Sequence, residues 1–195
     1  DGGLYVPEHF PKQVLSYEAL KEKSYQEIVE IVLSHFFTNF TAEERKQMIS
    51  QAYNDKTFRD SRIVPLHSID TNLSIAELFH GRTVAFKDLA LSLFPYLLTA
   101  AKKQEKENRD ILILTATSGD TGKAALEGFK DVEGTNIMVF YPSEGVSPMQ
   151  KQQMDKQEGD NVNVQAIHGN FDDAQSFLKC VFINPEVNDY AHDHG

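Results

Sequence analysis

Cysteine is nearly absent from this chain of 195 residues, and metal-binding patterns are missing. Cys180 is the one cysteine, so it cannot form an internal disulfide, and a reducing compartment is expected. His192 and His194 form the only close histidine pair near the chain end, without a third ligand at a zinc spacing. We therefore expect no metal site.

Positive charge and long apolar runs are also scarce. The 19 lysines and arginines face 29 acidic residues, a formal net charge of -10, which argues against nucleic-acid binding because that depends on neutralising phosphates. No apolar run approaches the roughly 18 residues of a membrane span. The first residues, 1–7, lack the basic and apolar regions of a secretion signal. These absences favour an acidic cytoplasmic protein.

Helical patterns occupy the first third of the chain. Ser24 with Glu27, and Thr41 with Glu44, each form the sequence pattern of a capping box, and apolar residues follow both at helical spacing. We expect a helical N-terminal region over 1–60, followed by an irregular connection.

The remainder, 61–195, alternates short apolar runs with helical segments, the pattern of βαβ units. It predicts an α/β fold with a parallel sheet flanked by helices. Strands are expected at 73–78, 110–115, 136–141 and 161–167, and helices at 87–103, 121–130, 148–157 and 171–183. Pro95 should kink the first of these helices, since it donates no hydrogen bond and clashes with the preceding turn.

The third of these helices has a well-marked start. Ser147 is expected as N-cap, Pro148 as first helical residue and Gln150 as capping partner. Its polar side chains, Gln150 included, are most simply a solvated helix face.

Lys87 is the first candidate for chemistry. It lies at the edge of an expected apolar helix face. Burial of a lysine favours the neutral amine, which can attack a carbonyl and form a Schiff base. Alternatively, Lys87 extends to solvent and pairs with Asp88 or Glu77. Helix position alone favours the second interpretation.

The turn at 115–122 is the second candidate. It joins a strand to a helix, so it would present N–H groups, small hydroxyls and the positive end of the helix dipole to a carboxylate or phosphate. Its glycine spacing fits neither a Walker loop nor a dinucleotide-binding motif. An ordinary capped turn, with Ser118 or Asp120 as cap, is the alternative.

Together these segments resemble threonine synthase, a pyridoxal-phosphate (PLP) enzyme of the tryptophan-synthase-like fold (fold type II). Similar segments occur in the same order along the chain, at 1–4, 77–81, 86–88, 117–122, 141–150 and 169–172. Several matching segments are more specific than one.

The resemblance implies a site and a reaction. Lys87 would carry PLP as a Schiff base and move protons between substrate carbons, while the cofactor acts as electron sink. Phe86 and Asp120 would contact the cofactor. The loop would bind the substrate carboxylate through Thr117, Ser118, Gly119, Asp120 and Thr121. The implied reaction converts O-phospho-L-homoserine and water to L-threonine and phosphate, the last step of threonine biosynthesis.

The chain departs from the family pattern in two ways. Arg82 stands where the family usually has proline, and could touch the substrate phosphate or only solvent. No glycine-rich cup for the cofactor phosphate follows Lys87, and no residue can be assigned to the pyridine nitrogen. In the family these lie further downstream, so the resemblance implies an N-terminal part of a longer enzyme. We expect this part alone to be inactive and to bind PLP weakly.

Three other functions stay open: a threonine-synthase-like phospho-lyase, an amino-acid dehydratase or cysteine-synthase-like enzyme of the same fold, and a cofactor-free α/β module. The dehydratase and cysteine-synthase-like enzymes usually have asparagine where this loop has Asp120. The module would lose nothing but ordinary stability in a Lys87→Ala variant. The sequence does not decide between a monomer and a homodimer.

Overall fold

Two compact units make up the chain, Asp1–Glu77 and Leu78–Gly195. The computed structural model describes residues 5–11 and 16–194, without the side chains of Ala191, His192 and His194. The segment at 1–4 that contributes to the family resemblance lies outside the described residues. The division falls after Glu77, so residues 61–77 lie in the first unit, whereas the sequence pattern assigned them to the α/β region.

The first unit begins with three helices, α1 (Tyr17–Leu20), α2 (Tyr25–Phe36) and α3 (Ala42–Ala52). Both expected capping boxes are confirmed. The Glu27 carboxylate accepts a hydrogen bond from the Ser24 N–H at 2.8 Å, and Ser24 Oγ accepts one from the Glu27 N–H. The second box has the same reciprocal bonds. Local sequence thus fixes where both longer helices begin.

A hairpin completes the first unit. Strands β1 (Leu66–Ser68) and β2 (Ser74–Ala76) pair antiparallel. The expected parallel strand at 73–78 is therefore wrong. The Asp70 carboxylate accepts hydrogen bonds from the N–H groups of Asn72 and Leu73 at 2.7 and 2.9 Å, which turns the chain back on itself. Strand β2 therefore pairs with β1, the strand just before it in the chain, and not with the parallel sheet.

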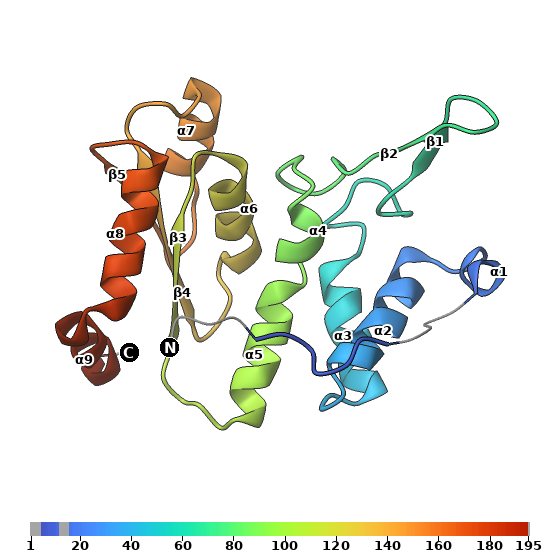
Figure 1. The fold of residues 1–195 in the computed structure, drawn as a ribbon, viewed down its shortest axis with the longest axis horizontal. Coiled ribbons are helices and arrows are strands. Elements are labelled where there is room, and N and C mark those ends of the chain that lie inside the picture. The colour runs from blue at the N-terminus through green and yellow to red at the C-terminus, as the bar shows by residue number, and fades with distance from the viewer. Residues whose placement is uncertain (1–4, 12–15, 195) are drawn as a thin grey trace. The chain divides into compact units, whose positions relative to one another are not determined.

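The second unit contains the predicted parallel sheet, in the order β3, β4, β5. Its strands are β3 (Ile111–Ala116), β4 (Thr135–Pro142) and β5 (Val162–Ile167). Four helices follow or lie between the strands: α6 (Asp120–Phe129), α7 (Pro148–Asp155), α8 (Phe171–Ile183) and α9 (Pro185–His194). Helix α8 covers one face of the sheet and α6 the other (Figure 1). The α/β fold with a parallel sheet is confirmed.

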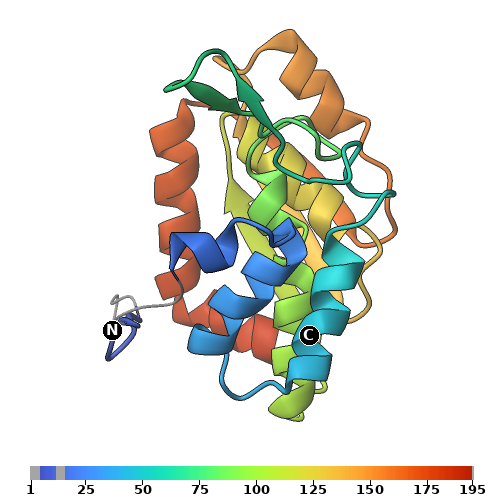
Figure 2. The same ribbon diagram turned by 90° about the vertical axis from the view of Figure 1, so that its right-hand side faces the viewer.

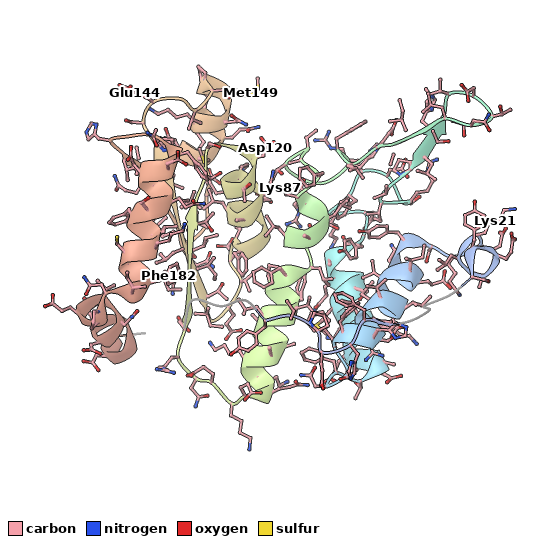
Figure 3. All side chains as sticks on the ribbon, in the orientation of Figure 1. Lys21, Lys87, Asp120, Glu144, Met149 and Phe182 are labelled. Atoms are coloured by element: carbon pink, nitrogen blue, oxygen red, sulfur yellow. The ribbon has the colours of Figure 1, made fainter. Side chains whose placement is uncertain are left out.

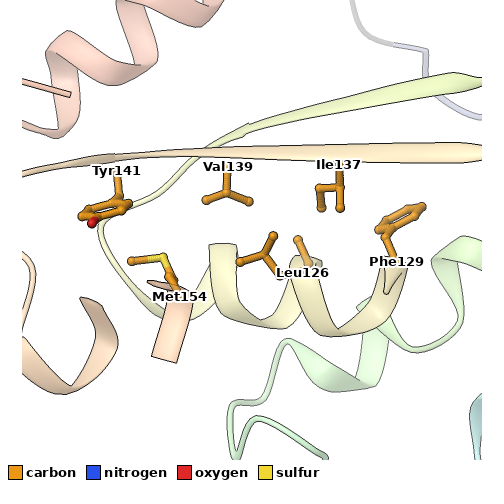
Figure 4. Packing of buried hydrophobic residues seen from close by; sticks show 7 residues of the cluster. Leu126, Phe129, Ile137, Val139, Tyr141 and Met154 are labelled. Carbon is orange, nitrogen blue, oxygen red and sulfur yellow. The ribbon is translucent and has the colours of Figure 1, made fainter. Parts of the chain in front are cut away.

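The core of this unit lies between β4 and α6 (Figure 4). Alternate residues of the central strand point to α6, and the buried cluster consists of Ala125, Leu126, Phe129, Ile137, Val139, Tyr141 and Met154. On the opposite face of β4, Phe140 makes an edge contact with Phe177 of α8, with ring centroids 5.3 Å apart. Both faces of the central strand are therefore buried, as a parallel strand requires.

The expected helix at 87–103 is interrupted. It forms a short α4 (Asp88–Leu91) and then α5 (Phe94–Gln104), so Pro95 occupies the first turn of a new helix instead of kinking a continuous one. Pro95 has no N–H to offer the carbonyl of Leu91. That carbonyl instead lies against Gly128 of α6, where a Cβ atom would be 2.4 Å from the oxygen. Helices α4 and α6 consequently run side by side (Figures 1 and 2).

The buried phenol of Tyr141 should make the stability of the second unit depend on pH in the alkaline range. Its hydroxyl donates to Asp155 Oδ1 at 2.8 Å, and burial, aided by this carboxylate, raises its pKa from 10.0 to about 12. The folded state thus favours the neutral phenol. Its contribution to stability is complete below about pH 10 and is lost as the pH rises toward about 12. We expect the stability difference between wild type and Tyr141→Phe to shrink over this range in denaturant unfolding. Parallel curves would contradict the assignment.

None of the helices in the described residues is long and apolar enough to cross a membrane.

Candidate functional site

The candidate site lies at the carboxyl ends of the parallel strands. Helices α4 and α6 both begin at this end, and Figure 3 shows Lys87 and Asp120 there, each at the start of its helix. Open α/β sheets usually bind their ligands at this edge. Lys87 and the turn at 115–122, which are at least 28 positions apart in the sequence, thus lie at one end of one unit.

A tight turn precedes Lys87. The buried Asp88 carboxylate accepts hydrogen bonds from the N–H and the hydroxyl of Thr83, at 2.8 and 2.6 Å. Gly81 packs so closely on this carboxylate that a Cβ atom would lie 2.4 Å from it. Val84 has a φ of 64°, an uncommon conformation for a β-branched residue and a costly one. The turn therefore holds the start of α4 in one conformation.

Lys87 itself is partly buried and contacts an aromatic ring. Its Nζ lies 4.4 Å from the ring centroid of Phe86, a cation–π distance, and the ring is 58% exposed. No ion pair of Lys87 occurs among residues 5–11 and 16–194. Asp88, one of the two expected ion-pair partners of Lys87, accepts hydrogen bonds from Thr83 instead. The amine is therefore available to a ligand at this edge.

The buried Thr117 side chain forms hydrogen bonds to the backbone of its own loop. It is 2% exposed, and its Oγ1 accepts hydrogen bonds from the N–H groups of Gly119 and Gly122, both at 3.0 Å. Gly122 must lack a side chain, because a Cβ atom there would lie 2.3 Å from Thr117 Cγ2. The Thr117 hydroxyl is thus used within the loop.

The other loop residues face outward. Ser118, Asp120 and Thr121 are exposed, and no acceptor is found in the described chain for their N–H groups. These N–H groups open α6, where the helix dipole adds positive potential. Neither Ser118 nor Asp120 acts as a side-chain cap, since Gly119 is the N-cap and makes no side-chain bond. The arrangement is suited to a carboxylate or phosphate.

Gln150 is a site residue that sequence reasoning missed. It was expected on a solvated helix face, yet its Nε2 donates to Asp120 Oδ1 at 2.7 Å. The expected helix start is confirmed, with Ser147 as N-cap and Pro148 in the first turn. That pattern placed Gln150 in the first turn, but a contact between residues 30 positions apart leaves no periodic signal.

The Arg82 side chain forms an ion pair within the protein. Its guanidinium lies 3.6 Å from the Glu127 carboxylate of α6, and Lys123 approaches the same carboxylate at 3.8 Å. Gln157, just after the end of α7, also donates to Glu127 at 3.3 Å, and Lys123 contacts Gln157. Arg82 therefore joins the turn before Lys87 to the helix that follows the loop. No group of metal-ligating side chains is present in the described part of the chain.

Loss of the Thr117 hydroxyl should loosen the loop. In Thr117→Val the shape is kept, but the buried N–H groups of Gly119 and Gly122 lose their acceptor. We expect the free energy of unfolding to fall by about 2 to 4 kcal/mol, because each buried unpaired N–H costs about 1 to 3 kcal/mol. Urea unfolding measures the change. The matched control is Thr121→Val on the exposed side of the loop, which should change stability by less than about 0.5 kcal/mol. Equal effects of the two variants would refute the role of Thr117.

Comparisons with known proteins agree with this fold. The family described as "Threonine synthase N terminus" matches residues 1–53. Threonine synthase of Schizosaccharomyces pombe is 37% identical over 98% of this chain and 39% of its own length. The Pseudomonas aeruginosa enzyme is 38% identical over 93% of this chain and 38% of its own length. The crystal structure of PLP-bound threonine synthase from Brucella melitensis has a TM-score of 0.83 at 38% identity, covering 95% of this chain and 39% of that one.

The fold and the site define an α/β protein in which a lysine without an ion pair and a loop with unpaired N–H groups, as found in the described residues, lie at the carboxyl edge of a parallel sheet. The chain is a homologue of the threonine synthases, and its fold is part of the fold of these enzymes. Both the family resemblance and the fold class expected from the sequence are confirmed. The chain spans about 39% of the length of the curated relatives it matches.

Proposed function

We propose that this chain provides the reactive lysine and the substrate loop of a cytoplasmic threonine synthase that converts O-phospho-L-homoserine and water to L-threonine and phosphate. One observation carries the proposal. The amine of Lys87, without an ion-pair partner in the described residues, lies at the same end of the unit as a loop with free N–H groups. Homology to the threonine synthases supports the same reaction.

The residues present fit PLP at the lysine. A free amine is what a cofactor aldehyde requires, and Phe86 beside Nζ would cover one side of that attachment point. The bound cofactor would supply an electron sink for the substrate carbons. A cup for the cofactor phosphate is not found in the described chain, so this chain alone should bind PLP weakly.

Each residue at the site has a proposed task. Lys87 would hold the cofactor, and its Nζ atom would take and return protons at the substrate carbons. The N–H groups and hydroxyls of Ser118 and Thr121 would bind the substrate carboxylate. Asp120 would contact the cofactor from the same turn. Thr117 and Gly119 hold these groups in place from within the loop.

The test measures phosphate and threonine formed from O-phospho-L-homoserine by the full-length protein that carries this chain, with PLP added. Equal amounts of both products are expected. Phosphate without threonine would instead indicate a phospho-lyase, and neither product from a folded, PLP-loaded protein would overturn the proposal. The 195-residue chain alone is the control, and it should form neither product because it lacks the cup for the cofactor phosphate.

A further inference from the structure

Gln150 connects two helices of the second unit at the candidate site. Its amide is bonded at both ends: Nε2 donates to Asp120 Oδ1 at 2.7 Å, and Oε1 accepts from the Ser147 hydroxyl at 2.9 Å. The Ser147 hydroxyl also accepts from the Gln150 N–H, at 3.3 Å, as the N-cap of α7. The amide therefore cannot turn over without losing its bond to Asp120, because a carboxylate oxygen accepts hydrogen bonds and does not donate them. Its donor side is fixed toward Asp120.

Gly119 makes room for this amide. A Cβ atom at Gly119 would lie 2.5 Å from Gln150 Nε2 and 2.7 Å from Cδ. The backbone of Gly119, with a φ of 161°, is close to extended, so conformation alone does not require glycine there. The glycine is needed because the Gln150 amide passes over it to reach the carboxylate.

Helix α7 is itself anchored to the unit. Met154 is fully buried in the core cluster, and Asp155 accepts the hydrogen bond of Tyr141. Gln157, just beyond the helix, bonds to Glu127 of α6. Gln150 thus acts from a fixed helix, and the position of its amide is set by the core.

The Asp120 carboxylate keeps one oxygen unused. Gln150 binds Oδ1, whereas no donor to Oδ2 is found among the described residues. A carboxylate held at one oxygen has a defined plane and direction for the other. Without the amide, the exposed Asp120 side chain would be free to rotate.

We propose that Gln150 is a positioning residue of the reaction: through its bond to Oδ1 it aims the second oxygen of Asp120 at the cofactor and substrate. This inference rests on the proposed function. Its chemistry is a neutral amide that orients an anion without neutralising it. A misplaced group at a reacting centre commonly costs rate in the chemical step, while substrate binding by the loop N–H groups is retained.

The experiment compares variants of the full-length protein with PLP and O-phospho-L-homoserine. Gln150→Ala should lower kcat about 10- to 100-fold with less than about a threefold change in KM. Gln150→Glu should be equally slow at neutral pH and recover at lower pH, because a protonated Glu can donate to Asp120 as the amide does. Gln153→Ala and Gln153→Glu are the matched controls on the exposed side of α7, and should behave like wild type.

The outcomes separate the two proposals. An active wild type with unchanged kcat in Gln150→Ala would overturn the role of Gln150 alone. A loss in Gln150→Glu that does not diminish at lower pH, with folding intact by circular dichroism, would also overturn it. A wild type that forms no products would overturn the proposed function and this inference with it.

Discussion

Lys87→Ala is expected to abolish the formation of both threonine and phosphate in the full-length protein. Proton transfer by a positioned group alone contributes about 10²- to 10⁴-fold to rate, and this substitution also removes the attachment point of the cofactor. We therefore expect a loss of at least about 10³-fold in kcat. Folding should persist, since Lys87 makes no ion pair in the described chain and its amine lies against the exposed Phe86 ring.

Two further measurements make this result specific. Borohydride reduction of the PLP-loaded wild type, followed by peptide mass spectrometry, should place the cofactor on Lys87. Lys151→Ala, which removes an exposed lysine of α7, should leave activity and labelling unchanged. Retained formation of both products in Lys87→Ala would overturn the assignment of Lys87 as the reactive lysine.

The largest effect on stability is expected from Phe129→Ala. Phe129 is 1% exposed, lies in the core between β4 and α6, and makes an edge contact with Phe94 at 5.6 Å between centroids (Figure 4). Loss of the ring leaves a cavity that the surrounding strand and helices cannot fully close. The expected loss is about 3 to 5 kcal/mol of unfolding free energy, a large part of the about 5 to 15 kcal/mol typical of a folded domain.

Chemical denaturation monitored by circular dichroism measures this loss. Phe182→Ala is the matched control, because Phe182 is 58% exposed on α8 (Figure 3) and loses little buried surface. It should change the free energy of unfolding by less than about 0.5 kcal/mol. A loss below about 1 kcal/mol for Phe129→Ala would mean that the core repacks, contrary to a close-packed interior.

Much of the fold was predictable because its signals are local. The capping boxes at Ser24 and Thr41 and the Ser147 cap fix helix starts within a few residues. The alternating apolar runs identify the three parallel strands. The hairpin was not predictable in the same way, because a short apolar run does not reveal its partner, and the Asp70 turn decided the pairing.

The break before Pro95 shows a second limit of sequence reasoning. Proline predicts a disturbed helix, but the sequence does not show whether the helix bends or starts again. Tertiary contact decided the outcome, since the free carbonyl of Leu91 packs against Gly128 on another helix.

The sequence predicted which residues lie at the candidate site, but not which hydrogen bonds and ion pairs they form. Lys87 and the loop were identified from position and from the family resemblance. The alternative pairing of Lys87 with Asp88 was not found, because Thr83 satisfies that carboxylate. Gln150 and Arg82 act across helices, through Asp120 and Glu127, and such pairs arise only once the helices pack.

The close contact of α4 with α6 at Gly128 affects the distance between Lys87 and the loop. Leu91 lies one helical turn after Lys87 and donates its N–H to the Lys87 carbonyl at 2.9 Å, while its own carbonyl lies against Gly128. The two helices thus approach each other main chain to main chain at this point, while the Leu91 side chain packs against the core cluster. A side chain at position 128 would push α4 away from α6, and the start of α4 at Lys87 would move with it. The distance between the lysine and the loop therefore depends on the missing side chain of a glycine that lies in neither.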